Sequence, residues 1–269
     1  MIASQSSPAA ADAGGHPLAA AVRARFALVV LLFALAIVGW WFTVGAMAGM
    51  DDGPWTALGS LGWFLGVWVV MMAAMMFPSL APTAALYARM TRDRAAPLVF
   101  TGGYLVTWTL AGALAFALAR VGDAVGGDVL AWDRLGQWVA GATLLAAAVY
   151  ELTPLKDVCL GKCRSPLGFL LGSWRDGSSG ALQMGARHGA WCVGCCWALM
   201  ASLFALGVMN VAWMAFVAGL IAFEKLIRWR WLATYGTAAV LATLGVLLLA
   251  APHVLPALTI PHHGSGSMM

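Results

Sequence analysis

The sequence FALVVLLFALAIVGWWFTVGAM, residues 26–47, is almost entirely apolar and carries no charged side chain. A helix needs about 20 apolar residues to cross the hydrocarbon core of a bilayer. Comparable runs recur along most of the chain, which predicts a helical membrane protein with about seven spans. The expected spans are residues 26–47, 58–77, 97–119, 132–152, 189–208, 211–226 and 232–251.

The overall composition supports this fold class. Of the 269 residues, 62% are hydrophobic and 10% are charged, whereas an ordinary globular domain is about 25% charged. We therefore expect an all-α, polytopic transmembrane helix bundle whose main partner is the lipid bilayer. The net charge of +4 then reflects the orientation of the loops and does not indicate nucleic-acid binding.

The distribution of basic residues predicts the orientation of the chain. Thirteen of the fifteen Lys and Arg residues fall on the N-terminal arm or on alternate connections between the expected spans. Such an excess marks the cytoplasmic side of a membrane protein. We therefore expect the N-terminus in the cytoplasm and the C-terminus outside. All five cysteines then lie near the cytoplasmic face.

The apolar spans and the two ends divide the chain into three parts. Residues 1–22 are small, polar and punctuated by Pro and Gly, so we expect a disordered arm. Residues 23–255 form the expected transmembrane helical domain, with an interfacial cysteine-containing loop at residues 153–180. Residues 256–269 are expected to be a flexible tail.

The segment QMGARHGAWCVGCCWALM, residues 183–200, contains three of the five cysteines. On a helix, His188, Cys192, Cys195 and Cys196 share one arc, so several donors can face a single point. Buried cysteine is also a common small hydrophobic residue, and packing is the alternative interpretation. Three cysteines within five residues, one turn after a histidine, favour metal ligation.

The two other cysteines lie in the preceding connection. Thr153 and Pro154 are typical of a helix start, with Thr as the cap and Pro in the first turn. Cys159 and Cys163 would then share one face of a short interfacial helix. Their spacing matches the lower range of structural zinc sites, and Cys192 and Cys195 could complete a set of four thiolates. A disulfide is disfavoured because thiols stay reduced on the cytoplasmic side.

A run of methionines lies in the second expected span, and Pro78 and Pro82 are expected to end or kink that helix. The methionines are Met71, Met72, Met75 and Met76. Methionine is a pliable filler of cores, so packing and metal ligation are both retained as interpretations. Ligation is considered because the expected topology places these thioethers at the same depth as the cysteines.

Two glutamates lie near the expected inner ends of spans. Glu151 and Glu224 are expected to reach the interface or to pair with a nearby Lys or Arg, and a role in proton coupling or metal relay is retained as a further interpretation. The chain has no glycine-rich phosphate loop, no His-Glu-x-x-His motif and no haem-attachment motif. The sequence therefore favours a metal-handling protein over an enzyme, without deciding between them.

Mixed thiol and thioether donors with one nearby imidazole favour Cu(I) as the metal. The function predicted first is binding of Cu(I) for transport or delivery, with a metallochaperone or a metalloenzyme as partner. A membrane assembly factor with a structural zinc-thiolate site is the alternative. A membrane thiol-disulfide oxidoreductase is disfavoured because it usually has one cysteine pair on the oxidising side. The oligomeric state is not indicated.

Three segments together resemble an uncharacterised bacterial family of predicted metal-binding integral membrane proteins. These are MMAAMMFP at residues 71–78, YELTPLKDVCLGKCRSPLGFLL at 150–171 and MGARHGAWCVGCCWALM at 184–200. The resemblance implies membrane location and a suspected metal, and it implies no established reaction. We expect a multi-pass protein of the bacterial inner membrane. The positions that match the family are Met71, Met72, Met75, Met76, Cys159, Cys163, His188, Cys192, Cys195 and Cys196.

Overall fold

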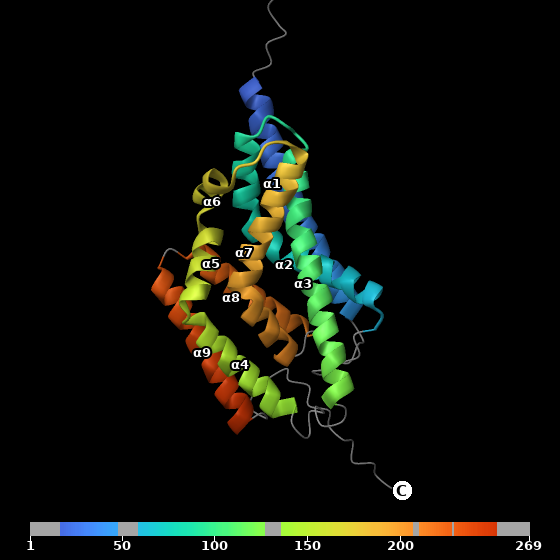
Figure 1. The fold of residues 1–269 in the computed structure, drawn as a ribbon, viewed down its shortest axis with the longest axis vertical. Coiled ribbons are helices and arrows are strands. Elements are labelled where there is room, and N and C mark those ends of the chain that lie inside the picture. Colours follow the sequence, from blue (N-terminus) through green and yellow to red (C-terminus); the bar gives the residue numbers. More distant parts are fainter. Residues whose placement is uncertain (1–16, 48–58, 127–135, 207–209, 228, 252–269) are drawn as a thin grey trace, which may run out of the picture.

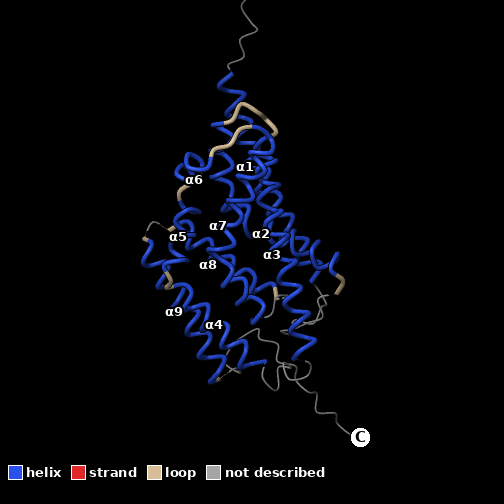
Figure 2. The backbone as a smooth tube through the Cα atoms, in the orientation of Figure 1, coloured by secondary structure: helices blue, strands red, loops and turns tan. Residues whose placement is uncertain are grey.

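The structure is a computed structural model that describes residues 17–47, 59–126, 136–206, 210–227 and 229–251. In these ranges the chain is helical, apart from short loops, and contains no strand (Figure 2). This confirms the expected all-α class. The helices are α1 (Pro17–Met47), α2 (Leu61–Met90), α3 (Ala96–Gly126), α4 (Gln137–Glu151), α5 (Pro154–Arg164), α6 (Pro166–Ser173), α7 (Gly177–Leu206), α8 (Val211–Leu226) and α9 (Arg230–Ala250).

Four of these helices contain a segment that is long and apolar enough to cross a membrane: Arg25–Ala46, Leu61–Met90, Ala96–Gly122 and Arg230–Ala250. A fifth crossing results if α4 and α5, which meet at a bend of 68°, form one broken span. Large apolar side chains such as Ile37, Leu110 and Leu118 are exposed on the outside of the bundle. Such surfaces suit contact with lipid. Seven crossings and the orientation remain predictions.

The bundle is built from three lengthwise helix pairs: α1 with α2, α3 with α7, and α4 with α9 (Figure 1). Helix α2 is the most buried of the four span candidates and contacts α1, α3, α6 and α8. The short helices α5 and α6 connect α4 to α7, and α5 packs on both α7 and α8. The fold therefore places α5 between elements that are distant in the sequence.

Glycines bring α3 and α7 unusually close together. A methyl group added at Gly103 would overlap the carbonyl oxygen of Leu182, and one added at Gly185 would overlap the carbonyl oxygen of Phe100. Small residues allow such close contact of helix backbones in membrane proteins. The hydroxyl of Thr107 on α3 also donates to the carbonyl oxygen of Ala186 on α7, at 2.9 Å. This contact fixes the register of the two helices.

The prediction that Pro78 or Pro82 ends the second helix is wrong, because α2 continues through both prolines to Met90. Prolines are tolerated in helices at membrane depth, where neighbouring helices and polar side chains compensate for the missing hydrogen bonds. Helix α7 also differs from its expected span, since it begins at Gly177 instead of residue 189. His188 and Cys192 therefore lie inside a continuous helix.

The ends of the chain are only partly described. Helix α1 begins at Pro17, so residues 17–22 of the expected disordered arm are helical. Residues 1–16 and the expected tail at 256–269 lie outside the described residues, as does the start of the expected fourth span at residue 132.

The connection at residues 153–180 consists mainly of the two short helices and the start of α7. The predicted helix start is confirmed: the Thr153 side chain accepts a hydrogen bond from the Lys156 backbone N–H, and Pro154 occupies the first turn. Helix α6 buries Phe169 and Leu170 and is far too short to cross a bilayer. The cap and the bend after α4 determine where the cysteines of α5 point.

Candidate metal centre

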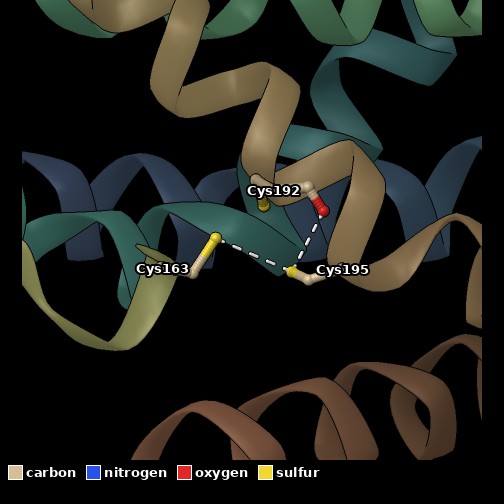
Figure 3. Close-up of side chains that lie close together, drawn as sticks. All are labelled: Cys163, Cys192 and Cys195. Atoms are coloured by element: carbon tan, nitrogen blue, oxygen red, sulfur yellow. Dashed lines mark hydrogen bonds between the residues drawn. The ribbon is translucent and has the colours of Figure 1, made fainter. Parts of the chain in front are cut away.

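Three thiols from two helices converge in the interior of the protein. The Sγ atoms of Cys163 on α5 and of Cys192 and Cys195 on α7 all lie within 4.8 Å of one another (Figure 3). The Cys195 thiol donates to the Cys163 sulfur at 3.7 Å and to the Cys192 carbonyl oxygen at 3.1 Å. Cys192 and Cys195 are buried, whereas Cys163 is half-buried. We call these three residues the thiol cluster.

Helix periodicity and one glycine explain the convergence. Cys192 and Cys195 are three residues apart, so their side chains lie on the same face of α7. Gly194, between them, faces α5: a methyl group added there would lie 2.8 Å from the Sγ atom of Cys159. The hydroxyl of Tyr150 on α4 donates to the Gly194 carbonyl oxygen. The missing side chain at Gly194 thus lets α5 pack against α7 and bring Cys163 into the cluster.

The sulfur of Cys192 has two further polar neighbours. The Lys225 ammonium on α8 donates to it at 3.1 Å, and the Tyr104 hydroxyl on α3 lies 3.0 Å away. Lys225 also donates to the Ser79 hydroxyl at 3.2 Å. A cation next to a cysteine favours the thiolate, which is the form that binds metals. The surroundings of Cys192 therefore suit a metal-binding sulfur.

Sequence reasoning did not identify Lys225 or Tyr104 as part of this region. A signal existed for the lysine, because Lys225 follows directly on Glu224 and these two are the only charged residues in the apolar segment 211–226. Tyr104 gave no signal, since its contact with Cys192 depends on the close packing of α3 and α7.

His188 is not brought into the thiol cluster. Its ring is buried among three aromatic rings. The rings of His188 and Phe169 meet edge to face, with their centroids 4.8 Å apart, and the ring centroids of Phe100 and Tyr104 each lie 6.0 Å from that of His188. Its Nδ1 atom has no hydrogen-bond partner among the described residues. Of the four residues expected to face one point, namely His188, Cys192, Cys195 and Cys196, only Cys192 and Cys195 belong to the thiol cluster.

The two other cysteines lie beside the cluster and not in it. The Cys196 thiol donates to the Cys192 carbonyl oxygen at 2.9 Å and also interacts with the side chains of Cys192 and Cys195, although its sulfur is not in the group of three. Cys159 is buried against Gly194. Its sulfur is therefore close to α7, although it is not one of the three that lie within 4.8 Å of one another.

The four methionines of α2 are all buried in the core. Met76 lies next to the thiol cluster, since the Lys225 ammonium lies 3.9 Å from its sulfur. Met72 lies one turn before Met76, and Met71 and Met75 point to other parts of the helix surface. The structure therefore connects one end of the methionine run to the cysteines.

The geometry of the thiol cluster fits a soft cation. A metal ion about 2.3 Å from each of three thiolate sulfurs holds these sulfurs about 4 Å apart, which is close to the spacing observed here. Thiolates select Cu(I) or Zn²⁺ over hard cations. A structural zinc site has four protein ligands, whereas the cluster supplies three among the described residues.

Comparison with known proteins agrees with this chemistry. A family model described as PpoB2, copper chaperone, matches residues 65–248. The match includes the methionine run, both cysteine segments and Lys225. No curated protein and no solved structure matches the chain. The prediction of a metal-binding family is confirmed, and the chain belongs to the PpoB2 family of copper chaperones.

Proposed function

We propose that the protein is a multi-pass membrane protein that binds one Cu(I) ion through Cys163, Cys192 and Cys195 and delivers it to a client protein. The convergence of these three thiols, from two helices, carries the proposal. Cu(I) is the cargo of this protein, and the cysteines are its binding residues. The description of the family as copper chaperones favours delivery over transport across the membrane.

The number of donors in the cluster supports Cu(I). Three thiolates and one Cu(I) ion leave two negative charges uncompensated, and the ammonium of Lys225 offsets one of them. A structural zinc ion would need a fourth ligand, and with four thiolates it would leave the same two negative charges, so the donor number and not the charge favours Cu(I). Cys159 is the nearest further thiol on α5, so a zinc site with four thiolates is the alternative.

A cavity beside the cluster offers a route for the ion. It has a volume of about 400 Å³, and its lining includes Arg164, Ser165, Lys225 and Arg230. Lys225 connects this cavity to Cys192. Copper inside cells travels bound to thiolates, and such complexes are anionic. We propose that a metallochaperone or a metalloenzyme exchanges copper with the cluster at this basic opening.

The proposal includes the topology expected from the sequence. The protein would cross the bacterial inner membrane seven times, with its N-terminus in the cytoplasm. The basic opening would then face the cytoplasm, because Arg164 and Arg230 belong to the connections rich in Lys and Arg. Exchange would take place with cytoplasmic partners.

Metal analysis of the protein purified in detergent tests the proposal. We expect one Cu(I) ion per chain, and X-ray absorption should show about three sulfur neighbours at the distance of a thiolate ligand. Cys196→Ser is the matched control, because Cys196 lies on α7 beside the cluster but outside it. One zinc ion with four sulfur neighbours, one of them lost in Cys159→Ser, would replace the copper proposal with the structural zinc site.

A further inference from the structure

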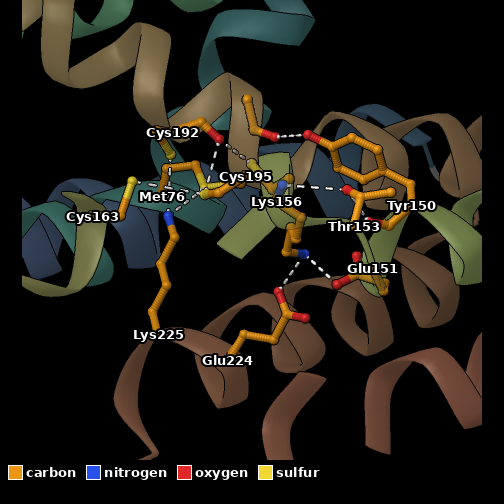
Figure 4. Close-up of polar contacts among 12 residues, drawn as sticks. Met76, Tyr150, Glu151, Thr153, Lys156, Cys163, Cys192, Cys195, Glu224 and Lys225 are labelled. Atoms are coloured by element: carbon orange, nitrogen blue, oxygen red, sulfur yellow. Dashed lines mark hydrogen bonds and ion pairs between the residues drawn. The ribbon is translucent and has the colours of Figure 1, made fainter. Parts of the chain in front are cut away.

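Next to the thiol cluster, one lysine lies between two glutamates. The Lys156 ammonium on α5 forms ion pairs with the carboxylates of Glu151 on α4 and Glu224 on α8. Its distance to Oε2 of Glu224 is 2.9 Å (Figure 4). The exposed fractions of the three residues are 1% for Glu151, 1% for Lys156 and 2% for Glu224. We call these residues the buried triad.

The charges of the buried triad do not balance if all three groups are ionised. Two carboxylates and one ammonium leave one negative charge in a region without solvent. An uncompensated buried charge is strongly unfavourable, and such a group takes up a proton instead. The Oε1 atoms of both glutamates have no hydrogen-bond partner among the described residues. These oxygens are available to hold a proton.

The neighbouring charged groups do not supply a second full counter-ion. Arg164, on the same helix as Lys156, is close enough for its charge to act on Glu224, but it lines the open basic cavity. Lys225 donates to Cys192 and Ser79 instead. Asp157 and Arg230 pair with each other at the exposed surface.

The other titratable neighbours are a phenol and a thiol. Tyr150 on α4 and Cys159 on α5 are near enough to feel the charge of Lys156. Both are neutral in their ordinary protonated forms, so neither offsets the extra negative charge. The imbalance therefore stays within the buried triad.

We propose that the buried triad is a proton-binding site, in which Glu151 and Glu224 share one proton. The occupied site contains one ammonium, one carboxylate and one carboxylic acid, and it is neutral. Both carboxylates meet on the same ammonium, so the proton belongs to the pair and not to either residue alone. Binding adds one proton to a carboxylate and changes no covalent bond between heavy atoms. This proposal does not depend on the proposed copper function.

The position of the site links it to the elements that hold the thiols. Lys156 lies one turn before Cys159 on α5, and Glu224 directly precedes Lys225 on α8. Gain or loss of the proton therefore changes the carboxylate charge that faces Lys156, on the helix that carries Cys163, and lies next to Lys225 on α8. Ionisable residues at such depth in membrane proteins are rare and often belong to proton pathways.

The composition of the chain permits a direct test. Glu151 and Glu224 are the only glutamates in the sequence. Carbon-13 labelling of glutamate therefore identifies their infrared bands in the metal-free, full-length protein in detergent. At neutral pH we expect one carbonyl stretching band of a protonated glutamate per chain. Both Glu151→Gln and Glu224→Gln should remove it, because each leaves one carboxylate paired with Lys156.

Two further variants test whether the infrared band depends on the charge of the buried triad. Lys156→Met should raise the signal to two protonated glutamates, because neither carboxylate then has a cation. Asp157→Asn, in the exposed pair with Arg230, should leave the band unchanged. Absence of the band in the unaltered protein at neutral pH would overturn the proposal. So would a band that persists in either glutamine variant, since the proton would then not be shared.

Discussion

The methionine run of α2 and the thiol cluster of α5 and α7 are both rich in sulfur, but the methionines come from one helix and the cysteines from two. Along α2 the four methionines span an arc of about 140°, and one of them, Met76, lies beside the cluster. The three thiols come from two helices and lie within 4.8 Å of one another. A concentration of donors along one helix therefore does not by itself make a site. Convergence of separate elements does.

The two glutamates also form a cluster only because separate helices bring them together. Glu151 and Glu224 are far apart in the sequence and meet on Lys156 of a third helix. The expectation that they pair with a nearby basic residue is confirmed. Helix α5 supplies both Lys156 and Cys163, so this short helix is the element on which the two clusters depend.

Removal of a cluster thiol should have the largest effect. In Cys192→Ser the affinity for Cu(I) should fall by more than about 100-fold, because a soft thiolate ligand is replaced by a hard hydroxyl. Competition with a Cu(I)-binding dye measures this change. Cys196→Ser should stay close to the unaltered protein. Equal losses in both variants would show that the cluster is not the binding site.

Separation of α5 from α7 should weaken binding without removal of any ligand. Gly194→Leu places a side chain where Cys159 lies, so the affinity for Cu(I) should fall by about 10- to 100-fold. The overpacking should also lower the free energy of unfolding by about 1–3 kcal/mol, measured by thermal unfolding in detergent. Gly172→Leu on α6, where an added methyl group meets no atom, is the control. Unchanged copper affinity in Gly194→Leu would contradict the inference that the packing of α5 against α7 brings the three thiols together for metal binding.

Loss of the compensating charge should have a smaller effect. Lys225→Met leaves the three thiols in place but removes the ammonium next to Cys192. We expect a loss of about 10-fold in Cu(I) affinity, as for other residues that support metal ligands. Lys162→Met, an exposed lysine on α5, serves as the control. Similar affinities in the two variants would mean that Lys225 does not stabilise the metal-bound thiolates.

The methionines should matter least. Met76→Leu should change the affinity for Cu(I) by less than about threefold, since Leu conserves volume and the thiols remain. Met72→Leu, one turn away, should have no effect on copper binding. A loss from Met76→Leu as large as that from Cys192→Ser would make this thioether a ligand. It would also remove the contrast between the two sulfur-rich regions.

Several features of the fold could be read from local patterns. The apolar runs predicted helices where α1, α3 and α9 occur, and Thr153 with Pro154 predicted the start of α5. The continuation of α2 through Pro78 and Pro82 could not be predicted. Whether a proline ends a helix depends on the neighbouring helices, which a local pattern does not contain.

The sequence alone determined the all-helical class, the apolar segments long enough to cross a membrane and the kinds of donor, because these follow from side-chain chemistry and its spacing along the chain. The tertiary structure decided that Cys163, Cys192 and Cys195 meet while His188 lies among aromatic rings. It also decided that Lys225 and the buried triad lie beside them. The periodicity of a helix defines which residues share a face, but the rotation of one helix against another depends on packing between distant segments.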